Sequence, residues 1–164
     1  MRACMLTYSF YENDGRVKRY AETLVRRGDH VDVVAVGKKG VESYAIINGV
    51  HVYCVQQRER NERGKLDYLF KIIKFLIISG YHLTRKYIQT PYDVIHVHSV
   101  PDFEVFSAII PKIFGARIIL DIHDPVPDFF AAKFGVTGNN KYIKILSAVE
   151  FISAKFSDHV ITVT

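Results

Sequence analysis

Residues Tyr92–Pro127 read YDVIHVHSVPDFEVFSAIIPKIFGARIILDIHDPVP, and this stretch decides the fold. Two short apolar runs, Asp93–His98 and Arg117–Ile122, are separated by a segment long enough for a helix. A strand, a crossover helix and a second strand form a βαβ unit. Such units build open parallel sheets, which bind ligands at the carboxyl ends of their strands. The histidines and carboxylates at both strand exits therefore mark the expected ligand site.

The rest of the chain alternates strands and helices around this unit. Most apolar runs are continuous and rich in Val and Ile, as in strands covered on both faces. Further strands are expected at Arg2–Tyr8, His30–Val36, Val50–Val55 and His159–Thr164, and helices at Gly15–Arg27, Leu66–Tyr87, Pro101–Phe114 and Tyr142–Phe156. Gly28 is expected to end the first helix as a left-handed C-cap. The segment Gly37–Asn48 is expected to be a loop with a short edge strand. Right-handed crossovers then predict an α/β, Rossmann-like, doubly wound, mainly parallel sheet of about six or seven strands with helices on both faces.

Length and composition describe one soluble globular domain. The 164 residues are enough to bury a core without disulfides or metals. Hydrophobic residues make up 49% and charged residues 24%, which excludes a disordered chain. The net charge of +5 favours an anionic partner, such as nucleic acid, an acidic lipid surface or a phosphorylated small molecule. Nucleic acid is the weakest of these, because the basic residues are scattered and no recognition motif is present.

The cysteines and the N-terminus indicate a cytoplasmic protein. Cys4 and Cys54 each lie inside an apolar run that is typical of a strand, which suits small buried side chains better than a disulfide or a metal site. The first residues, MRACMLTYSF, lack the basic and long apolar regions of a signal peptide. We therefore expect a reducing compartment and no secretion.

One apolar stretch, Leu66–Thr84, allows contact with a membrane. Its charge-free part, Phe75–Thr84, is ten residues long and too short to span a bilayer. Two interpretations stay open. The stretch is either a long helix packed against the sheet and a neighbouring helix, or a helix whose basic, aromatic surface touches anionic lipid headgroups. The second interpretation would place the protein peripherally on the inner face of the membrane.

The loop Ser9–Asp14 leaves the first strand and enters the first helix at the expected ligand edge. Backbone N–H groups near Asp14, Gly15 and Arg16 should point into that crevice, and helix N-termini of this kind attract anions. A GxGxxG sequence is absent here, so dinucleotide binding is poorly supported. Arg16 opposes the helix dipole. It either reaches toward a bound phosphate or sugar, or it lies in solvent.

Histidines recur at the exits of the two strands in the opening stretch. His96 and His98 alternate, so they share one face, and Asp121 and His123 end the next strand. Zinc or a dimetal centre is conceivable from these residues, but the compact motif of metallohydrolases is missing and we expect no metal. His96 lies deeper and is expected to be a hydrogen-bonded core residue. His98 and His123 are expected to face a ligand.

His123 is the sharpest candidate because Asp124 and two prolines follow it. Pro125 and Pro127 stiffen the exit loop, so the imidazole is held over the crevice by a rigid backbone. A neutral imidazole can hydrogen-bond a sugar hydroxyl, and a neighbouring carboxylate can fix its tautomer. Asp124 alternatively caps a helix that begins near Asp128.

Four segments in order resemble the N-terminal domain of family 4 glycosyltransferases of the GT-B fold: NDGRVKRYAETLVRRGDHVDVVAV, YDVIHVHSVPD, IILDIHDPVPD and VEFISAKFSDHVITVT. The resemblance implies two Rossmann-like domains facing a cleft. The first would hold the acceptor and the second the nucleotide-sugar, and transfer would proceed with retention and without a metal or other cofactor. It also implies a single acceptor-side domain over residues 1–164, with the donor-binding domain absent from this chain.

The resemblance also assigns roles to residues. His123 corresponds to the family's histidine and would contact the donor sugar near the reacting centre, as the catalytic residue. The loop Phe10–Arg16 would lie where the acceptor and the donor phosphates meet. The expected substrate-binding residues are Phe10, Asp14, Gly15, Arg16, His98, Asp102, Asp124 and Asp128. The family's paired glycines are absent after Tyr8, Asp128 stands where a glutamate is usual, and no Glu-x7-Glu donor motif is present.

The leading hypothesis is therefore the acceptor-side domain of a retaining glycosyltransferase, which transfers a sugar from a nucleotide-sugar to a glycan or lipid-linked acceptor. By itself the chain should not catalyse sugar transfer, because a second domain or a partner subunit must bind the donor. One alternative is a non-catalytic membrane-docking subunit that recruits a separate donor-binding protein. A further alternative is a metal-dependent hydrolase.

Overall fold

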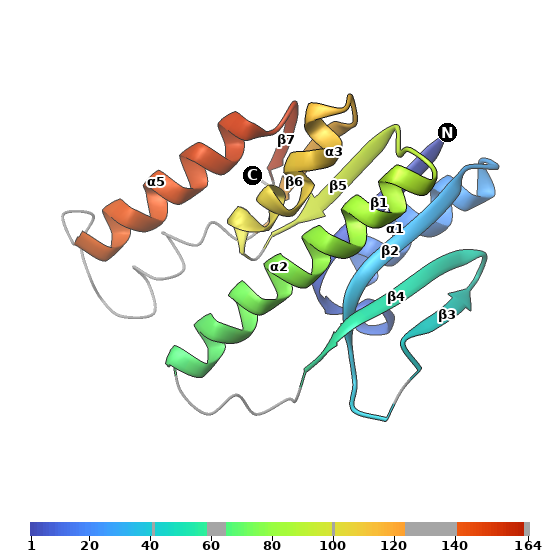
Figure 1. Ribbon diagram of the computed structural model, residues 1–164, viewed down its shortest axis with the longest axis horizontal. Coiled ribbons are helices and arrows are strands. Elements are labelled where there is room, and N and C mark those ends of the chain that lie inside the picture. Colours follow the sequence, from blue (N-terminus) through green and yellow to red (C-terminus); the bar gives the residue numbers. More distant parts are fainter. Residues whose placement is uncertain (41, 59–64, 100, 124–140, 163–164) are drawn as a thin grey trace.

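A computed structural model describes residues 1–40, 42–58, 65–99, 101–123 and 141–162 of the chain. Its sheet has seven strands in the order β3-β4-β2-β1-β5-β6-β7 (Figure 1). Their bounds are Arg2–Phe10 for β1, His30–Gly37 for β2, Tyr44–Ile47 for β3, Val50–Gln57 for β4, Val94–His98 for β5, Arg117–Ile122 for β6 and His159–Thr162 for β7. Every neighbouring pair is parallel except β3 and β4. The predicted α/β, mainly parallel sheet is confirmed.

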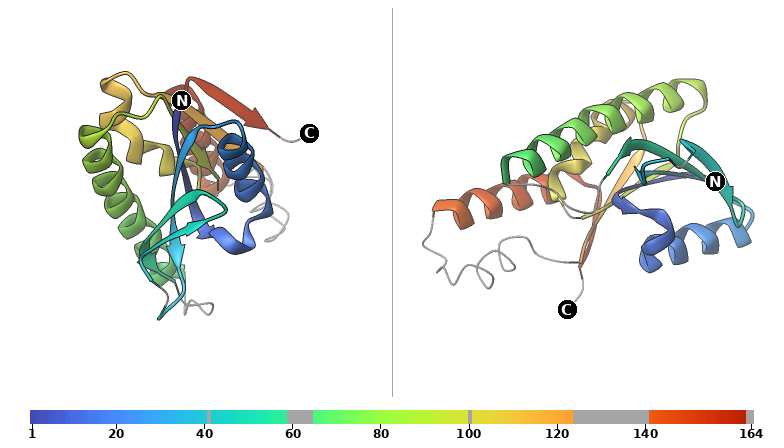
Figure 2. Two further views of the ribbon diagram at one scale, coloured as in Figure 1. Left: turned by 90° about the vertical axis from the view of Figure 1, so that its right-hand side faces the viewer. Right: turned by 90° about the horizontal axis from the view of Figure 1, so that it is seen from below.

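Helices cover both faces of this sheet, as predicted. The α-helices are α1 (Gly15–Arg26), α2 (Lys65–Gln89), α3 (Ile109–Ile113) and α5 (Lys141–Phe156), and the 3₁₀ helices are η1 (Tyr11–Asn13) and η2 (Asp102–Ala108). Figure 2 shows α1 on one face and α2, α3 and α5 together on the other. Each face has its own apolar core, with Val17 and Ala21 of α1 in one and Ile72 and Phe75 of α2 in the other.

The predicted helix Pro101–Phe114 is wrong in its type. The segment forms the 3₁₀ helix η2 and then the five-residue α3. Pro111 explains the break, because it has no N–H group for the carbonyl four residues earlier and its ring clashes with that carbonyl. Proline is tolerated only in a first turn, so the α-helix has to begin at Ile109.

The edge strand predicted within Gly37–Asn48 is β3, which pairs with β4 in a tight hairpin. Ile47 pairs with Val50, which leaves Asn48 and Gly49 as the two turn residues. Their φ angles are 52° and 81°, and Asn-Gly is the usual pair for a turn that needs left-handed φ at both positions. This hairpin supplies the antiparallel edge of the sheet.

Both ends of α1 are capped by residues that the sequence marks. Asp14 accepts hydrogen bonds from the backbone N–H groups of Arg16 and Val17 at its Oδ1 atom. Gly28 follows the helix with a φ of 90°, which confirms the predicted glycine C-cap. An aspartate N-cap of this kind is worth about 1 kcal/mol. The caps hold the first turn of α1 at the carboxyl ends of β1 and β6.

The two cysteines match the prediction of unreactive apolar side chains. Cys4 is buried in the core and Cys54 is partly buried, and neither forms a disulfide. Burial raises the pKa of both thiols, so the reactive thiolate is disfavoured.

Candidate functional site

Polar residues from β5, β6 and the start of α1 meet at the carboxyl edge of the sheet. Arg16 donates from Nη1 to Oδ1 of Asp121 at 3.2 Å, although the two residues are 105 positions apart. The other oxygen of Asp121 lies 3.2 Å from Nδ1 of His98. Asp121 and His98 are buried, while Arg16 is partly exposed. We call these three residues the rim network.

The charge of Asp121 is stabilised inside the protein. Burial raises the pKa of this carboxyl group, but the hydrogen bond from His98 and the positive charge of Arg16 outweigh burial and bring the pKa below its usual value. A carboxylate can only accept hydrogen bonds, so Nδ1 of His98 carries the hydrogen. In a neutral ring, Nε2 of His98 is then an acceptor, and this atom has no partner among the described residues.

His96 differs from its prediction as a hydrogen-bonded core residue. It is buried, but its Nε2 atom has no partner within the described part of the chain. Its ring lies 4.1 Å from that of His98 and 5.2 Å from that of Tyr20. Burial, helped by the neighbouring His98 ring, lowers the pKa of His96 to about 3. His96 is therefore neutral at physiological pH and lines a mainly apolar cavity of about 510 Å³ beside α1.

A second cavity, of about 280 Å³, opens beside the rim network. Its lining includes Arg16, Arg19, Tyr20, Asp121 and Ile161. The Tyr20 ring also stacks on His98, with 5.9 Å between ring centroids. Neither Tyr20 nor Arg19 was among the predicted site residues. Their spacing of three and four residues from Arg16 on one helix could have indicated that they share its side.

Asp14 has a structural role that uses both of its carboxylate oxygens. Oδ1 caps α1, and Oδ2 accepts from the Ser9 hydroxyl at 2.7 Å, which in turn lies 2.8 Å from the Thr7 hydroxyl. The N–H group of Arg16, one of those that the sequence suggested as anion ligands, is thus occupied by this cap, as is the N–H group of Val17. Among the described residues, a Cβ added to Gly15 would meet no atom within 4 Å.

Three further predicted site residues, Asp102, His123 and Phe10, lie around the same edge. Asp102 is buried at the start of η2, where burial raises the pKa of its carboxyl group and Ser99 and His123 partly oppose this. His123 follows β6 and is partly buried, with an Nδ1 atom that has no partner among the residues described. Phe10 ends β1 and packs against the core. Asp124, Asp128 and the two prolines lie outside the described residues.

One group within the described ranges has the composition of a metal site. Ligand atoms of His96, His98 and Asp121 all lie within 4.8 Å of one another. Both oxygens of Asp121 are already engaged, one by the guanidinium of Arg16 and one by His98. A cation would have to displace or approach the positive charge of Arg16, which disfavours a divalent metal at this position.

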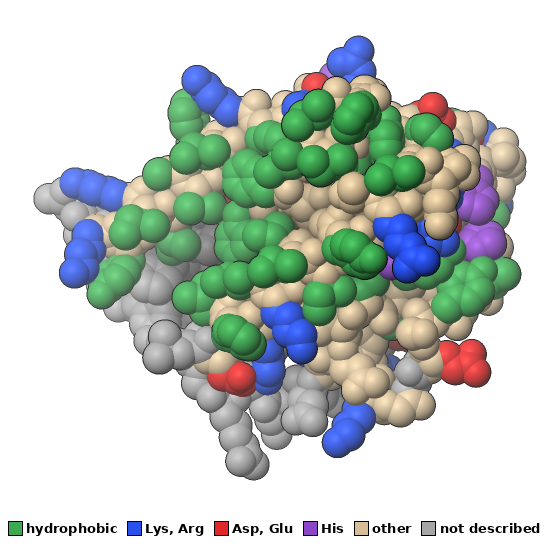
Figure 3. Space-filling view, viewed as in Figure 1, with side chains coloured by type: hydrophobic (Ala, Val, Ile, Leu, Met, Phe, Trp, Pro, Cys, Tyr) green, Lys and Arg blue, Asp and Glu red, His purple; other side chains and the backbone are tan. Residues whose placement is uncertain are grey.

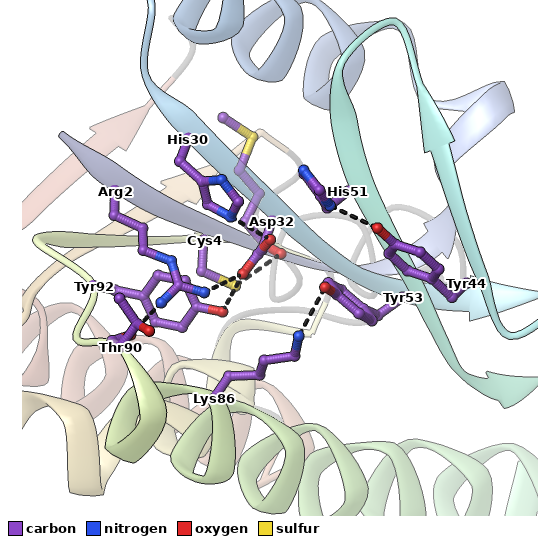
Figure 4. Close-up of polar contacts among 11 residues, drawn as sticks. Arg2, Cys4, His30, Asp32, Tyr44, His51, Tyr53, Lys86, Thr90 and Tyr92 are labelled. Atoms are coloured by element: carbon purple, nitrogen blue, oxygen red, sulfur yellow. Dashed lines mark hydrogen bonds and ion pairs between the residues drawn. The ribbon is translucent and has the colours of Figure 1, made fainter.

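A second polar cluster lies at the opposite, amino edge of the sheet (Figure 4). Asp32 is completely buried there and accepts from Arg2 at 3.0 Å, from the Tyr92 hydroxyl at 2.6 Å and from Nε2 of His30 at 3.1 Å. Arg2 also lies over the Tyr92 ring at 4.5 Å. Sequence analysis missed this cluster, because its members come from three separate segments.

Comparison with known proteins shows which family the chain resembles in sequence. The sequence matches the model of Glycosyltransferase Family 4 over residues 16–164. A search of curated proteins found no match. Within the described residues, no helix is long and apolar enough to cross a membrane.

Several solved structures share the fold. Sucrose-phosphate synthase from Thermosynechococcus elongatus superposes with a TM-score of 0.70 at 12% identity, over 97% of this chain and 41% of that chain. UGT73P12 of Glycyrrhiza uralensis, complexed with glycyrrhetinic acid 3-O-monoglucuronide, gives 0.61 at 13% identity over 99% and 43%. Os79 from O. sativa, in complex with UDP, gives 0.57 at 10% identity over 99% and 46%. The chain thus spans less than half of each of these proteins, and the likeness concerns the fold alone.

Proposed function

Because the chain belongs to Glycosyltransferase Family 4, we propose that it is the acceptor-side domain of a retaining glycosyltransferase. The whole enzyme would transfer a sugar from a nucleotide-sugar to a glycan or lipid-linked acceptor. A donor-binding domain or partner subunit would face the carboxyl edge of the sheet and complete the cleft. We place the enzyme in the cytoplasm, peripherally on the inner face of the membrane.

The rim network is the observation that supports this proposal. Sugar transfer from a diphosphate needs groups that orient hydroxyls and stabilise a departing anion, rather than a strong nucleophile. The edge offers Nε2 of His98 and Nδ1 of His123, both without partners among the described residues, together with the cation of Arg16. In this proposal His123 contacts the donor sugar, and Asp102 and Gly15 lie along the acceptor path.

We further propose that the reaction needs no metal or other cofactor. Arg16 supplies the positive charge at the edge, and Asp121 holds it there through the 3.2 Å hydrogen bond. Asp14 would act indirectly, because its carboxylate is used to cap α1 and so to fix the position of Arg16.

The test joins this domain to its donor-binding half and measures transfer or hydrolysis of a nucleotide-sugar. His123→Ala should lower turnover roughly 100-fold or more, the usual contribution of a group that acts directly at the reacting centre. The matched control is His159→Ala, since His159 begins β7 at the amino edge of the sheet and is exposed. Unchanged turnover in His123→Ala would remove the catalytic assignment.

A metal-dependent hydrolase is the second candidate, and the spacing of His96, His98 and Asp121 is the observation in its favour. Elemental analysis of the purified protein separates the two candidates. A stoichiometric transition metal that is lost in His96→Ala would support the hydrolase. Transfer that continues at full rate in a chelator would support the glycosyltransferase.

A further inference from the structure

Three helices on one face of the sheet expose many large apolar side chains. Figure 3 shows these side chains spread across the face that α2, α3 and α5 cover. Monomeric soluble proteins seldom expose wide apolar patches unless the patch binds something. The large apolar residues exposed on these helices and just after α3 include Leu69, Phe70, Ile73, Ile77, Tyr81, Ile88, Ile109, Ile110, Ile113, Phe114, Ile145, Phe151 and Ile152.

Helix α2 is apolar on its outer side as well as its inner side. Its inner side buries Phe75 and Leu83 completely in the core. On its outer side Phe70 is 69% exposed and Ile77 is 66% exposed. A helix that only covers a sheet needs one apolar stripe and carries polar residues opposite it. The outer apolar stripe of α2 is therefore not explained by the fold.

Positive charge is concentrated on the same three helices. Together α2, α3 and α5 contain nine lysines and arginines and two acidic residues. Their net charge exceeds the +5 of the whole chain, so the remainder is slightly acidic. Asp67, one of the two acids, is paired with Lys71 at 2.7 Å. Lys74 and Arg85 lie on the side of α2 that carries Ile77 and Tyr81, because their spacing is three or four residues.

This combination selects an anionic bilayer over a second copy of the chain. A symmetric dimer would place the basic surface against itself, and like charges at an interface disfavour association. A bilayer offers an apolar layer directly below a negatively charged one, which matches apolar residues interspersed with lysines and arginines. We propose that this docking face, the outer surface of α2, α3 and α5, lies on anionic membrane with its apolar side chains among the lipid headgroups.

The docking face is distinct from the rim network. Arg16 and Tyr20 belong to α1, which covers the opposite face of the sheet (Figure 2). Asp121 faces that side too, because it pairs with Arg16. Membrane binding can therefore be measured on the chain of 164 residues without any transferase activity. Its failure would overturn the proposed membrane location but leave the proposed sugar transfer untouched.

The first experiment is cosedimentation of the chain with vesicles. Vesicles of phosphatidylcholine and phosphatidylserine should bind it, and vesicles of phosphatidylcholine alone should not. Lys74→Glu with Arg85→Glu should lower the partition coefficient roughly 25-fold or more, since each basic residue near an anionic surface contributes about fivefold. The matched control is the double variant Arg26→Glu with Lys39→Glu, which changes two exposed positions outside the docking face. This control should bind the anionic vesicles at least about fivefold more tightly than the variant with Lys74→Glu and Arg85→Glu.

The second experiment uses the absence of tryptophan from the chain. Ile77→Trp places a single fluorophore on the docking face, and Arg26→Trp places one at an exposed position of α1, on the opposite face of the sheet. On anionic vesicles the emission of Trp at position 77 should shift to shorter wavelength, while that at position 26 should not change. An equal shift at both positions would contradict the proposed orientation.

Two results would overturn the proposal. One is binding that the Lys74→Glu and Arg85→Glu pair leaves unchanged. The other is a concentration-dependent dimer in sedimentation velocity that Phe70→Ser with Ile77→Ser dissociates, because that result would assign the face to a second copy of the chain.

Discussion

Asp32 and Asp121 are both completely buried in one sheet, and each accepts hydrogen bonds from an arginine and a histidine, yet they lie at opposite ends of the strands. Asp32 at the amino edge also accepts from Tyr92, and its arginine lies over the ring of that tyrosine. At the carboxyl edge, the histidine that contacts Asp121 keeps an unpartnered Nε2 atom among the described residues, and a cavity of about 280 Å³ adjoins the pair.

The comparison shows that similar groups serve different purposes at the two edges. Around Asp32, donors from three segments converge on both carboxylate oxygens, which ties the beginnings of β1, β2 and β5 together. Around Asp121, the same kinds of group leave hydrogen-bonding capacity beside an open cavity. A buried charge network is therefore a candidate site only where some of that capacity is left for a ligand.

Replacing Asp32 should cause the largest change in the free energy of unfolding. Asp32→Asn removes the negative charge that neutralises Arg2, and breaking a buried ion pair on one side costs about 3 kcal/mol or more. The unfolding free energy, measured by urea denaturation, should fall by that amount. The transferase turnover of the folded two-domain protein should not change. A strong loss of turnover at equal folded fraction would mean that the amino edge also belongs to the site.

Unlike Asp32 and Asp121, a third buried carboxyl group has no arginine partner among the described residues. Glu104 in η2 is buried, neither of its oxygens has a partner in the described part of the chain, and burial raises its pKa to about 9. Its pKa in the unfolded chain is about 4.3, so the folded state binds more protons between these values and stability falls as the pH rises, by at most about 1.4 kcal/mol per pH unit.

Glu104→Gln should abolish this pH dependence. The stability of the variant minus that of the wild type should be larger at pH 8 than at pH 5. Thermal denaturation of both proteins at the two pH values measures this difference. Equal pH dependence in both proteins would show that Glu104 gains a cationic or hydrogen-bonding partner in solution.

The smallest expected change in stability is that of Asp121. The pKa of this carboxyl group is lowered in the folded protein, so the charged form contributes stability above the unfolded value of about 3.9, and that stability is lost as the pH falls through the folded pKa. Asp121→Asn should cost about 1–2 kcal/mol at neutral pH, and urea denaturation should show a smaller loss of stability below pH 4 than in the wild type. If Asp121→Asn lowered the free energy of unfolding as much as Asp32→Asn does, the two edges would not differ in the way described.

Asp121→Asn should also impair the proposed reaction more than it impairs folding. Asparagine keeps only one acceptor oxygen, so either Arg16 or the Nδ1 atom of His98 would face an amide NH2 group and lose its hydrogen bond. A misplacement of about 1 Å at a reacting centre can reduce the rate roughly 100-fold. The measurement is nucleotide-sugar turnover at a temperature where both proteins are fully folded. Normal turnover there would indicate that the rim network is structural only.

The parallel sheet, its two helical layers and the carboxyl edge as the expected ligand site could all be predicted from local sequence patterns. Continuous Val and Ile runs predicted the parallel strands, Gly28 predicted the end of α1, and the resemblance to family 4 glycosyltransferases is confirmed by the family match. These signals are local, because each depends on the burial or the φ angle of a few consecutive residues. Pro111 carried a local signal too, and taking it into account would have corrected the predicted helix Pro101–Phe114.

The contacts between polar groups from distant segments could not be predicted, because they depend on the three-dimensional fold. Arg16 reaches Asp121 across 105 positions, and Asp32 collects Arg2 and Tyr92 from two other segments. Neither set of contacts produces a periodic pattern in the sequence, because the contacts depend on the order of the strands and on the face of the sheet to which each side chain points. The same limit applies to the docking face, since the outer apolar residues of α2, α3 and α5 form one surface only after the sheet has placed the three helices in one layer.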